Sequence, residues 1–168
     1  MAILTLKELR AALPAGKRLL GVDQSKKALG LALSSPDLAM ATPLTTIVRT
    51  KFTEDVKKLA EICREYAVGG FVIGLPFNMD GTEGPRVDSV RHFADNLTGA
   101  AGVLGFDPPI AFFDERLTTQ AAHDLLEEAA NISSKRRGNK GAAFRAEVID
   151  QLAAQIILQG ALEEISEI

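Results

Sequence analysis

The chain has 168 residues, of which 46% are hydrophobic and 24% are charged, and its formal net charge is −3. This composition is typical of one globular domain that buries its own core, so folding requires neither disulfides nor a structural metal. The mild negative charge argues against a protein that coats nucleic acid indiscriminately, and the absence of a long apolar run argues against a membrane span. We expect one cytoplasmic domain over residues 1–168, with no membrane partner.

The first predicted elements are a short helix and three strands. Thr5 and Glu8 have the spacing of a capping box, which predicts a helix within an N-terminal extension over residues 1–16. Strands are predicted over residues 18–23 and 28–34, and the few residues between them allow only a hairpin, so these strands must be antiparallel. Residues 42–48 are rich in β-branched side chains and form the third strand.

The rest of the chain alternates between helical stripes and short apolar runs. Thr53 can cap a helix with an apolar stripe through Leu59, and residues 71–75 form a continuous apolar run that is typical of a central strand. The remaining predicted elements are a helix over about 82–97, a strand over 109–113, and helices from Thr118 or Thr119 to about 130 and over 143–162.

This order of elements matches a ribonuclease-H-like α/β fold. Three meandering strands are followed by helices and strands in alternation, which predicts a mixed five-stranded sheet flanked by helices. Its strand order would be 3-2-1-4-5, with strand 2 antiparallel. In open α/β sheets, ligands bind beyond the carboxyl ends of the strands where the order reverses, and Asp23 ends the first strand at such a position.

Further acids could reach the same point as Asp23. Asp114 and Glu115 end the fifth strand at this edge of the sheet, and at most one of them points toward Asp23 because successive strand residues face opposite sides. In the last helix, Asp150 lies on the flank of the apolar stripe and leans toward the sheet edge. Such oxygen-only sites suit Mg²⁺ or Mn²⁺, and paired ions of this kind hydrolyse phosphodiesters. The candidate ligands are therefore Asp23, Glu115 or Asp114, and Asp150.

The loop GLPFNMDGTEGPR, residues 74–86, contains candidate substrate-binding residues. Asn78 favours a turn, and Thr82 can cap the helix that follows. Free backbone N–H groups and Arg86 would then lie near the positive end of that helix, where phosphates bind. A cap that serves only folding is the alternative. Arg116 is either the partner of a neighbouring acid or a phosphate contact.

A basic stretch precedes the last helix. Residues 133–145 read SSKRRGNKGAAFR and contain no acid. We expect residues 131–142 to form a mobile basic loop in which Lys135, Arg136 and Arg137 grip a nucleic-acid backbone. A solvated surface loop with no ligand is the alternative.

Five segments resemble, in order, the motifs of the YqgF family, also called RuvX. They read LLGVDQSKKALGLALSS, ATPLTTI, VIGLPFNMDGTEGPR, FFDERLTTQAA and VIDQLAAQIILQGAL. The family is described as Holliday junction resolvases and as nucleases that mature the ends of pre-16S ribosomal RNA. The resemblance covers about residues 19–162 and implies a ribonuclease-H-like fold, divalent-metal-dependent endonuclease activity, and catalytic and metal-binding acids at Asp23, Glu115 and Asp150. Where the family has glycine and threonine, this chain has Ser25 and Lys26.

The expected function is therefore metal-dependent hydrolysis of phosphodiester bonds in structured nucleic acid. The first hypothesis is that a monomer or homodimer processes the 5′ end of pre-16S rRNA during ribosome biogenesis. The alternatives are a Holliday junction resolvase acting on branched DNA, and a catalytically silent RNA-binding factor of ribosome assembly. The stretch around Asp23 also resembles the first phosphate loop of actin-like ATPases and sugar kinases, but those need a second lobe for which 168 residues leave no room.

Overall fold

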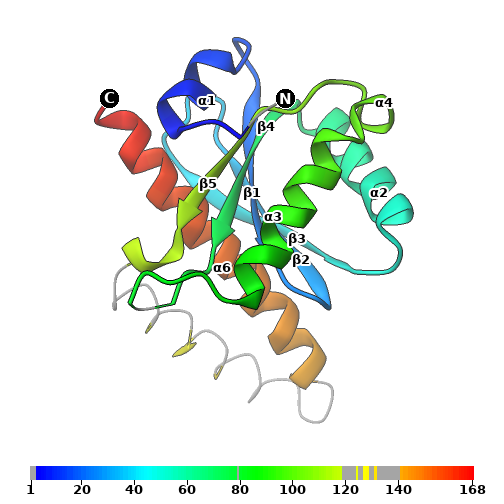
Figure 1. Cartoon of the computed structure of the whole chain (residues 1–168), viewed down its shortest axis with the longest axis vertical. Coiled ribbons are helices and arrows are strands. Elements are labelled where there is room, and N and C mark those ends of the chain that lie inside the picture. Colours follow the sequence, from blue (N-terminus) through cyan, green and yellow to red (C-terminus); the bar gives the residue numbers. More distant parts are fainter. Residues whose placement is uncertain (1–2, 79, 119–123, 125–126, 129–130, 132–140) are drawn as a thin grey trace.

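A five-stranded mixed sheet forms the centre of the protein (Figure 1). The computed structural model describes residues 3–78, 80–118, 124, 127–128, 131 and 141–168. Its strands lie in the order β3-β2-β1-β4-β5. Strand β2 is antiparallel to both its neighbours, whereas β1, β4 and β5 are parallel to one another. The predicted order and the antiparallel second strand are confirmed. The strands are β1 (Arg18–Gln24), β2 (Ala28–Ser34), β3 (Ala41–Val48), β4 (Val68–Leu75) and β5 (Ile110–Asp114).

Helices cover both faces of the sheet and create two hydrophobic cores. Helices α2 and α3 pack on one face, and α1 and α6 pack on the other (Figure 1). None of the described helices is long and apolar enough to cross a membrane. The helical elements are α1 (Leu6–Ala12), α2 (Phe52–Glu65), α3 (Pro85–Thr98), α4 (Ala101–Leu104), the 3₁₀ turn η1 (Glu115–Leu117) and α6 (Gly141–Ser166).

Helix α1 begins as predicted. The Thr5 amide donates to Glu8 Oε1, the Glu8 amide donates to Thr5 Oγ1, and both distances are 3.1 Å. This reciprocal pair is the predicted capping box. It anchors the segment that leads into β1.

The predicted caps of the next two helices are wrong. Helix α2 starts after Lys51 rather than at Thr53, because the buried carboxylate of Asp55 accepts hydrogen bonds from the Thr50 amide and hydroxyl and so holds the first turn from within. Helix α3 starts after Gly84 rather than at Thr82, because proline suits the first helical position, where its missing N–H costs no hydrogen bond.

Helix α6 crosses one face of the sheet and is fixed to the edge strand β3. The Thr46 hydroxyl donates to the Glu147 carbonyl at 3.0 Å. The side-chain amide of Gln155 donates to the backbone carbonyl of Ala41 at 3.1 Å. The Ala41 amide in turn donates to Gln159 Oε1 at 2.9 Å. These bonds set the position of the helix along the strands, and they thereby set the height of Asp150 relative to the end of β1.

Candidate active site

Asp23 and Glu115 line one pocket at the edge of the sheet toward which the β4 and β5 arrows point (Figure 1). Asp23 lies next to the end of β1, and Glu115 follows β5 and opens η1. The pocket has a volume of about 170 Å³, which at ~30 Å³ for each molecule accommodates about five waters. This volume is sufficient for a hydrated ion. The other residues that line it are Arg86, Thr118, Ala153, Ile156 and Ile157.

Arg116 decides which of the two consecutive acids faces the pocket. The carboxylate of Asp114 accepts hydrogen bonds from the Arg116 amide at 2.9 Å and from Arg116 Nη2 at 2.6 Å. The Arg116 side-chain hydrogen bond is the main reason that the pKa of Asp114 is lowered. Asp114 is therefore turned toward Arg116, and Glu115 is the acid that lines the pocket with Asp23.

A glycine in β4 makes room for Glu115. Strand β4 runs between β1 and β5, and a methyl group on Gly74 would lie 2.6 Å from Glu115 Oε1. The same methyl group would also collide with the side chain of Ile157 on α6. The Glu115 carboxylate and α6 both depend on the absence of a side chain at this position.

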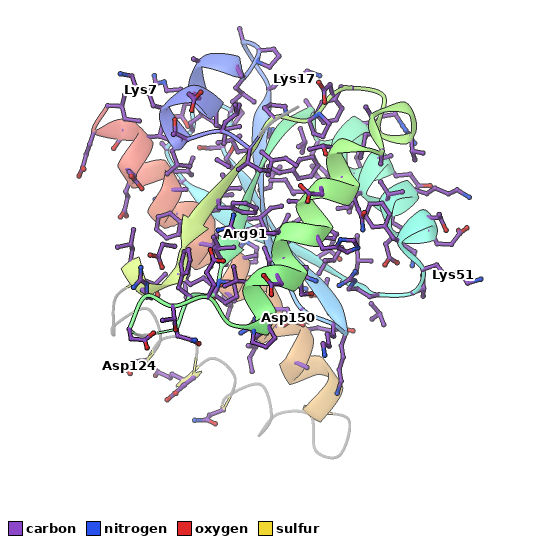
Figure 2. All side chains as sticks on the ribbon, in the orientation of Figure 1. Lys7, Lys17, Lys51, Arg91, Asp124 and Asp150 are labelled. Atoms are coloured by element: carbon purple, nitrogen blue, oxygen red, sulfur yellow. The ribbon has the colours of Figure 1, made fainter. Side chains whose placement is uncertain are left out.

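Asp150 of α6 packs against β2, the strand next to β1. Its backbone and Cβ lie against Gly30 of β2, and a Cβ on Gly30 would be 2.8 Å from Asp150 Cβ. Gly30 is the partner of Asp23 in the β1–β2 ladder. Asp150 therefore approaches Asp23 from one strand away, and it is not among the residues lining the pocket. Figure 2 shows Asp150 toward the lower end of the molecule.

Burial and neighbouring carboxylates raise the pKa of Asp23 and of Asp150. Burial raises the pKa of Asp23 to about 7, and the charges of Glu115 and Asp150 add to this rise, whereas Arg86 opposes it. Burial, and then the charge of Glu147, raises the pKa of Asp150. Such a cluster stays fully ionised near neutral pH only when a cation balances it.

The donor chemistry of this edge suits a hard divalent cation, because carboxylate oxygens are the preferred ligands of Mg²⁺ and Mn²⁺. The arrangement places two of the acids in one pocket and the third beside it. Within the described part of the chain, no three acids, histidines or cysteines are close enough together to hold one ion. Asp23 and Glu115 thus line one pocket with Asp150 beside it, and the binding of a metal ion by these three acids stays a prediction.

Two predicted substrate-binding residues hold the shape of the loop between β4 and α3. Thr82 donates its amide and its hydroxyl to Asp80 Oδ1, at 2.9 and 2.6 Å. The Asn78 side-chain amide donates to the Thr82 hydroxyl at 3.0 Å. Their contact with substrate stays a prediction, and Thr82 does not cap α3.

The two predicted arginines have different surroundings. Arg116 pairs with Asp114, and its guanidinium also lies over the Phe77 ring, 5.2 Å from the centroid. Arg86 is exposed and lines the pocket that contains Asp23. Arg86 therefore lies beside the acids of the pocket, whereas Arg116 is paired with Asp114, and contact of either arginine with a phosphate stays a prediction.

Lys135, Arg136 and Arg137 lie outside the described residues, as do most of the predicted basic loop over 131–142 and most of the predicted helix over 118–130. Sequence reasoning missed Thr118 as a pocket residue. Its hydroxyl donates to the Glu115 carbonyl at 2.7 Å, which closes η1 beneath the acid. The available signal is the threonine pair Thr118 and Thr119, which follows the charged triplet after one leucine and which predicts a helix start.

Ser25 fits the hairpin although the family has glycine there. Its backbone does not have a positive φ, since Leu38 and Ala67 are the non-glycine residues of the described chain that do. The Ser25 hydroxyl instead closes the turn, because it accepts from the Ala28 amide and donates to the Ala28 carbonyl, both at 3.1 Å. The replacement of glycine therefore leaves the path from β1 to β2 unstrained.

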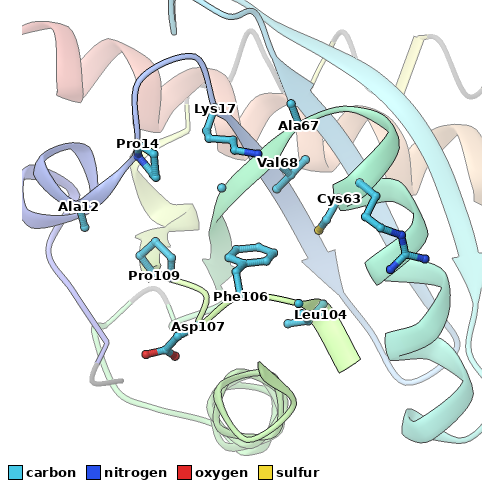
Figure 3. Close-up of a pocket in the computed structure, with 13 residues that line it drawn as sticks. Ala12, Pro14, Lys17, Cys63, Ala67, Val68, Leu104, Phe106, Asp107 and Pro109 are labelled. Atoms are coloured by element: carbon cyan, nitrogen blue, oxygen red, sulfur yellow. The ribbon is translucent and has the colours of Figure 1, made fainter. Parts of the chain in front are cut away.

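A larger cavity, of about 560 Å³, lies at the opposite end of the sheet (Figure 3). It is bounded by the ends of α1 and α2, the start of β4 and the segment before β5, and it includes Cys63 and Phe106. Burial raises the pKa of the Cys63 thiol to about 12, so it stays protonated and unreactive. The one acid lining this cavity is Asp107. Chemistry rather than size therefore places the candidate active site at the smaller pocket.

The chain is similar to known proteins in sequence and in fold. The family model described as "RuvX: Holliday junction resolvase" matches residues 17–164. A protein of Rhodospirillum centenum called "Putative pre-16S rRNA nuclease" is 47% identical over 167 residues, which cover 99% of this chain and 84% of that protein. A protein of the same name from Paramagnetospirillum magneticum is 48% identical over 166 residues, or 99% and 98% of the two chains. The solved structure "T. thermophilus RuvC in complex with Holliday junction substrate" aligns with a TM-score of 0.48 and 17% identity over 84% of this chain and 91% of that one.

Proposed function

The chain belongs to the RuvX family and is a nuclease of that family, and on this premise we propose that it cleaves phosphodiester bonds in a precursor of 16S ribosomal RNA with the help of Mg²⁺ or Mn²⁺. The observation that carries the proposal is the pocket in which Asp23 and Glu115 lie together, beside Arg86, at the carboxyl ends of β1 and β5. The names of the two relatives, each a pre-16S rRNA nuclease, support the choice of RNA.

Asp23 and Glu115 are the residues that would hold the divalent cation, and Asp150 would support it from the adjacent strand. When bound, such a cation stabilises the negative charge that develops on a phosphate during hydrolysis. Asp23 is positioned by the β1–β4 ladder, and Glu115 is positioned by the space above Gly74. Asp23 thus lies in a strand, and Glu115 lies in the 3₁₀ turn directly after one.

The remaining pocket residues of this chain would bind and enclose the phosphate. Arg86 supplies a guanidinium, which hydrogen-bonds phosphate oxygens in a planar fork. Ala153, Ile156 and Ile157 of α6 form an apolar wall. Such a wall excludes bulk water from one side of the phosphate, which strengthens the electrostatic contacts inside the pocket.

Cleavage of branched DNA is the second candidate activity, and the description of the family model favours it. The same pocket would serve both substrates, because its carboxylates and Arg86 would act on a phosphate, which RNA and DNA share. A direct comparison of the two nucleic acids therefore separates the candidates.

The test incubates the purified protein with a 16S rRNA precursor and with a four-way DNA junction, each with Mn²⁺, with Mg²⁺ and with a chelator. We expect metal-dependent cleavage of the RNA that Asp23→Asn and Glu115→Gln reduce at least about 100-fold. Asp114→Asn is the matched control, since its carboxylate faces Arg116, and it should lower the rate severalfold at most. Calorimetry should show Mn²⁺ binding to the wild type that Glu115→Gln weakens and Asp114→Asn retains.

Binding of the precursor without cleavage under every metal condition would contradict the proposal and favour a non-catalytic RNA-binding role. Cleavage of the junction alone would move the assignment to branched DNA. Equal loss of activity in Glu115→Gln and Asp114→Asn would show that the pocket containing Asp23 is not the active site.

A further inference from the structure

A second pocket lies on the other side of the β1 end from the candidate active site. It has a volume of about 380 Å³, and it is lined by Gln24, Ser25, Lys26, Pro85, Arg86 and Ser89. The acid-containing pocket is walled by residues of α6, whereas this one is walled by the first turn and a half of α3. Asp23 and Gln24 thus serve different pockets because consecutive strand residues face opposite sides of the sheet.

The two pockets share Arg86. This exposed side chain lines both of them, so it stands between the carboxylates of Asp23 and Glu115 and the second pocket. A nucleic-acid strand that places one phosphate beside Asp23 and passes over Arg86 would bring a neighbouring phosphate to the second pocket. The shared arginine therefore allows one strand to contact both pockets.

The second pocket has no acid in its lining, whereas the first has two. Its lining has two cations, Lys26 and Arg86, and no acid. Its neutral polar groups are the hydroxyls of Ser25 and Ser89 and the side-chain amide of Gln24. A phosphodiester carries one negative charge and only hydrogen-bond acceptors, which complement cations and donors. A metal ion would find no carboxylate ligand among these residues.

The walls of this pocket are fixed before any ligand binds. The Gln24 side chain is 3% exposed, and its amide donates to the Ser89 hydroxyl at 3.3 Å, which joins β1 to α3. The Ser25 amide donates to the Ala28 carbonyl at 3.0 Å, and Arg49 Nη1 donates to the Ser25 carbonyl at 2.9 Å. Lys26 therefore projects from a backbone turn that is held from both sides.

From these observations we propose that the second pocket binds a phosphate of the same nucleic-acid strand, adjacent to the scissile one, and that Lys26 is its specific cation. The inference rests on the proposed function for the class of substrate. It adds a position at which the strand is held and oriented, separate from the bond that is cut. Lys26 is a binding residue in this scheme and takes no part in the chemistry.

The chain supplies a matched control in the next residue. Lys27 is also exposed and also lies in the β1–β2 turn, but it is not among the residues that line the pocket. Lys26→Ala and Lys27→Ala therefore remove the same charge one residue apart. A general electrostatic effect would weaken binding equally in the two variants, whereas a specific contact would separate them.

The experiment measures binding by fluorescence anisotropy in an Asp23→Asn background, which prevents cleavage. The probe is a 2′-O-methyl oligonucleotide that spans the cleavage site of the precursor, with each phosphate in turn replaced by an uncharged methylphosphonate. We expect Lys26→Ala to weaken binding about tenfold and to reduce the slope of log K against log salt by about 0.7 to 0.9. Lys27→Ala should change affinity less than twofold. Lys26→Arg should restore most of the loss.

One methylphosphonate position, next to the scissile phosphate, should weaken binding of the parent protein but cause no further loss in Lys26→Ala. Equal effects of Lys26→Ala and Lys27→Ala, or the same sensitivity to every methylphosphonate in both variants, would overturn the inference. Cleavage of the precursor by the wild type is measured alongside. Normal cleavage by the wild type, together with unchanged affinity in Lys26→Ala, rejects phosphate binding in the second pocket but not the proposed function. Absence of cleavage rejects the proposed function, and the methylphosphonate binding measurements then decide whether the second pocket binds a phosphate. Absence of any binding rejects both.

Discussion

Gly74 lies directly beneath the carboxylate of Glu115, so that a methyl group on Gly74 would come within 2.6 Å of Glu115 Oε1. The acid belongs to η1 after β5 and the glycine to β4, so the contact joins neighbouring elements at the carboxyl edge of the sheet. This relationship connects the packing of the sheet to the position of the acid in the pocket.

We expect Gly74→Ala to reduce nuclease activity much more than a simple packing defect would. The added methyl group must displace Glu115 and Ile157, since neither can share its space. Overpacking of this kind costs about 1–3 kcal/mol of stability, and we expect at least a tenfold loss in kcat. Thermal unfolding and single-turnover cleavage measure the two effects.

The control for that substitution is Gly102→Ala, because no atom lies within 4 Å of a Cβ built on Gly102. Its position in the short helix α4 favours alanine, so stability should be unchanged or slightly raised, by up to about 1 kcal/mol. Equal loss of activity in both variants would refute the special role of Gly74.

Asp23→Asn should stabilise the metal-free protein at neutral and alkaline pH. The pKa of Asp23 is raised to about 7 in the folded state from an ordinary value of 3.8, so the folded state binds the proton more tightly than the unfolded state. The wild type therefore loses stability as the pH rises from about 4 to 7, on the order of 2–4 kcal/mol at most, and the variant lacks this loss.

Urea denaturation in chelator, from pH 4 to pH 8, measures this difference. The free energies of unfolding of variant and wild type should converge near pH 4 and diverge steadily up to about pH 7. A difference that does not change with pH would contradict the raised pKa of Asp23.

Mn²⁺ should stabilise the folded wild type and should stabilise Asp23→Asn far less. A ligand that binds only the folded state adds about 2.7 kcal/mol at a concentration of 100 Kd. Thermal shifts at pH 7.5 with increasing Mn²⁺ give the comparison, and Asp114→Asn should respond like the wild type. Equal shifts in all three proteins would place the ion elsewhere.

Asp55→Ala should strongly destabilise the fold without acting on the site. The buried Asp55 carboxylate accepts hydrogen bonds from the Thr50 amide at 3.1 Å and the Thr50 hydroxyl at 3.0 Å, and it lies 3.9 Å from Arg49 Nε. Removing it leaves these donors unsatisfied, at a cost of about 2–4 kcal/mol.

The neighbouring acid provides the comparison. Glu54 is exposed and pairs with Lys57 at 3.2 Å across one helical turn. Such surface pairs contribute about 0–1 kcal/mol, so Glu54→Ala should leave the unfolding midpoint nearly unchanged. A cost for Asp55→Ala as small as that for Glu54→Ala would show that the buried carboxylate is replaceable by water.

The sheet was predictable because its order follows from local features. The short gap between β1 and β2 permits only a hairpin, and the helical stripe before residues 71–75 requires a crossover. The start of β4 was predicted three residues late, because Gly69 and Gly70 were interpreted as a boundary. In the structure both lie inside the strand, where their missing side chains allow Lys17 and Leu19 to pack closely.

The site was predictable in its residue types but not in its geometry. Alternation along a strand predicts that at most one of Asp114 and Glu115 faces Asp23. The hydrogen bond from Arg116 to Asp114 selects between them, and this bond depends on the turn after β5. Helical periodicity likewise places Asp150 on a face of α6. Its height is set by the contact with Gly30 and by the hydrogen bonds between α6 and β3, and no pattern in the last helix contains that information.

Helix α6 is continuous from Asp150 to its contact with α1. Its last turns pack, through Leu162 and Ile165, against Leu6 and Leu9 of α1, while Asp150 lies about 22 Å away along the same helix axis. Between these points the helix rests on Gly21, where Ala154 and Leu158 leave no space for a Cβ. We therefore expect a substitution that tilts α6 at its contact with α1 to shift Asp150 relative to Asp23, because α6 is continuous and packs on Gly21 between the two points.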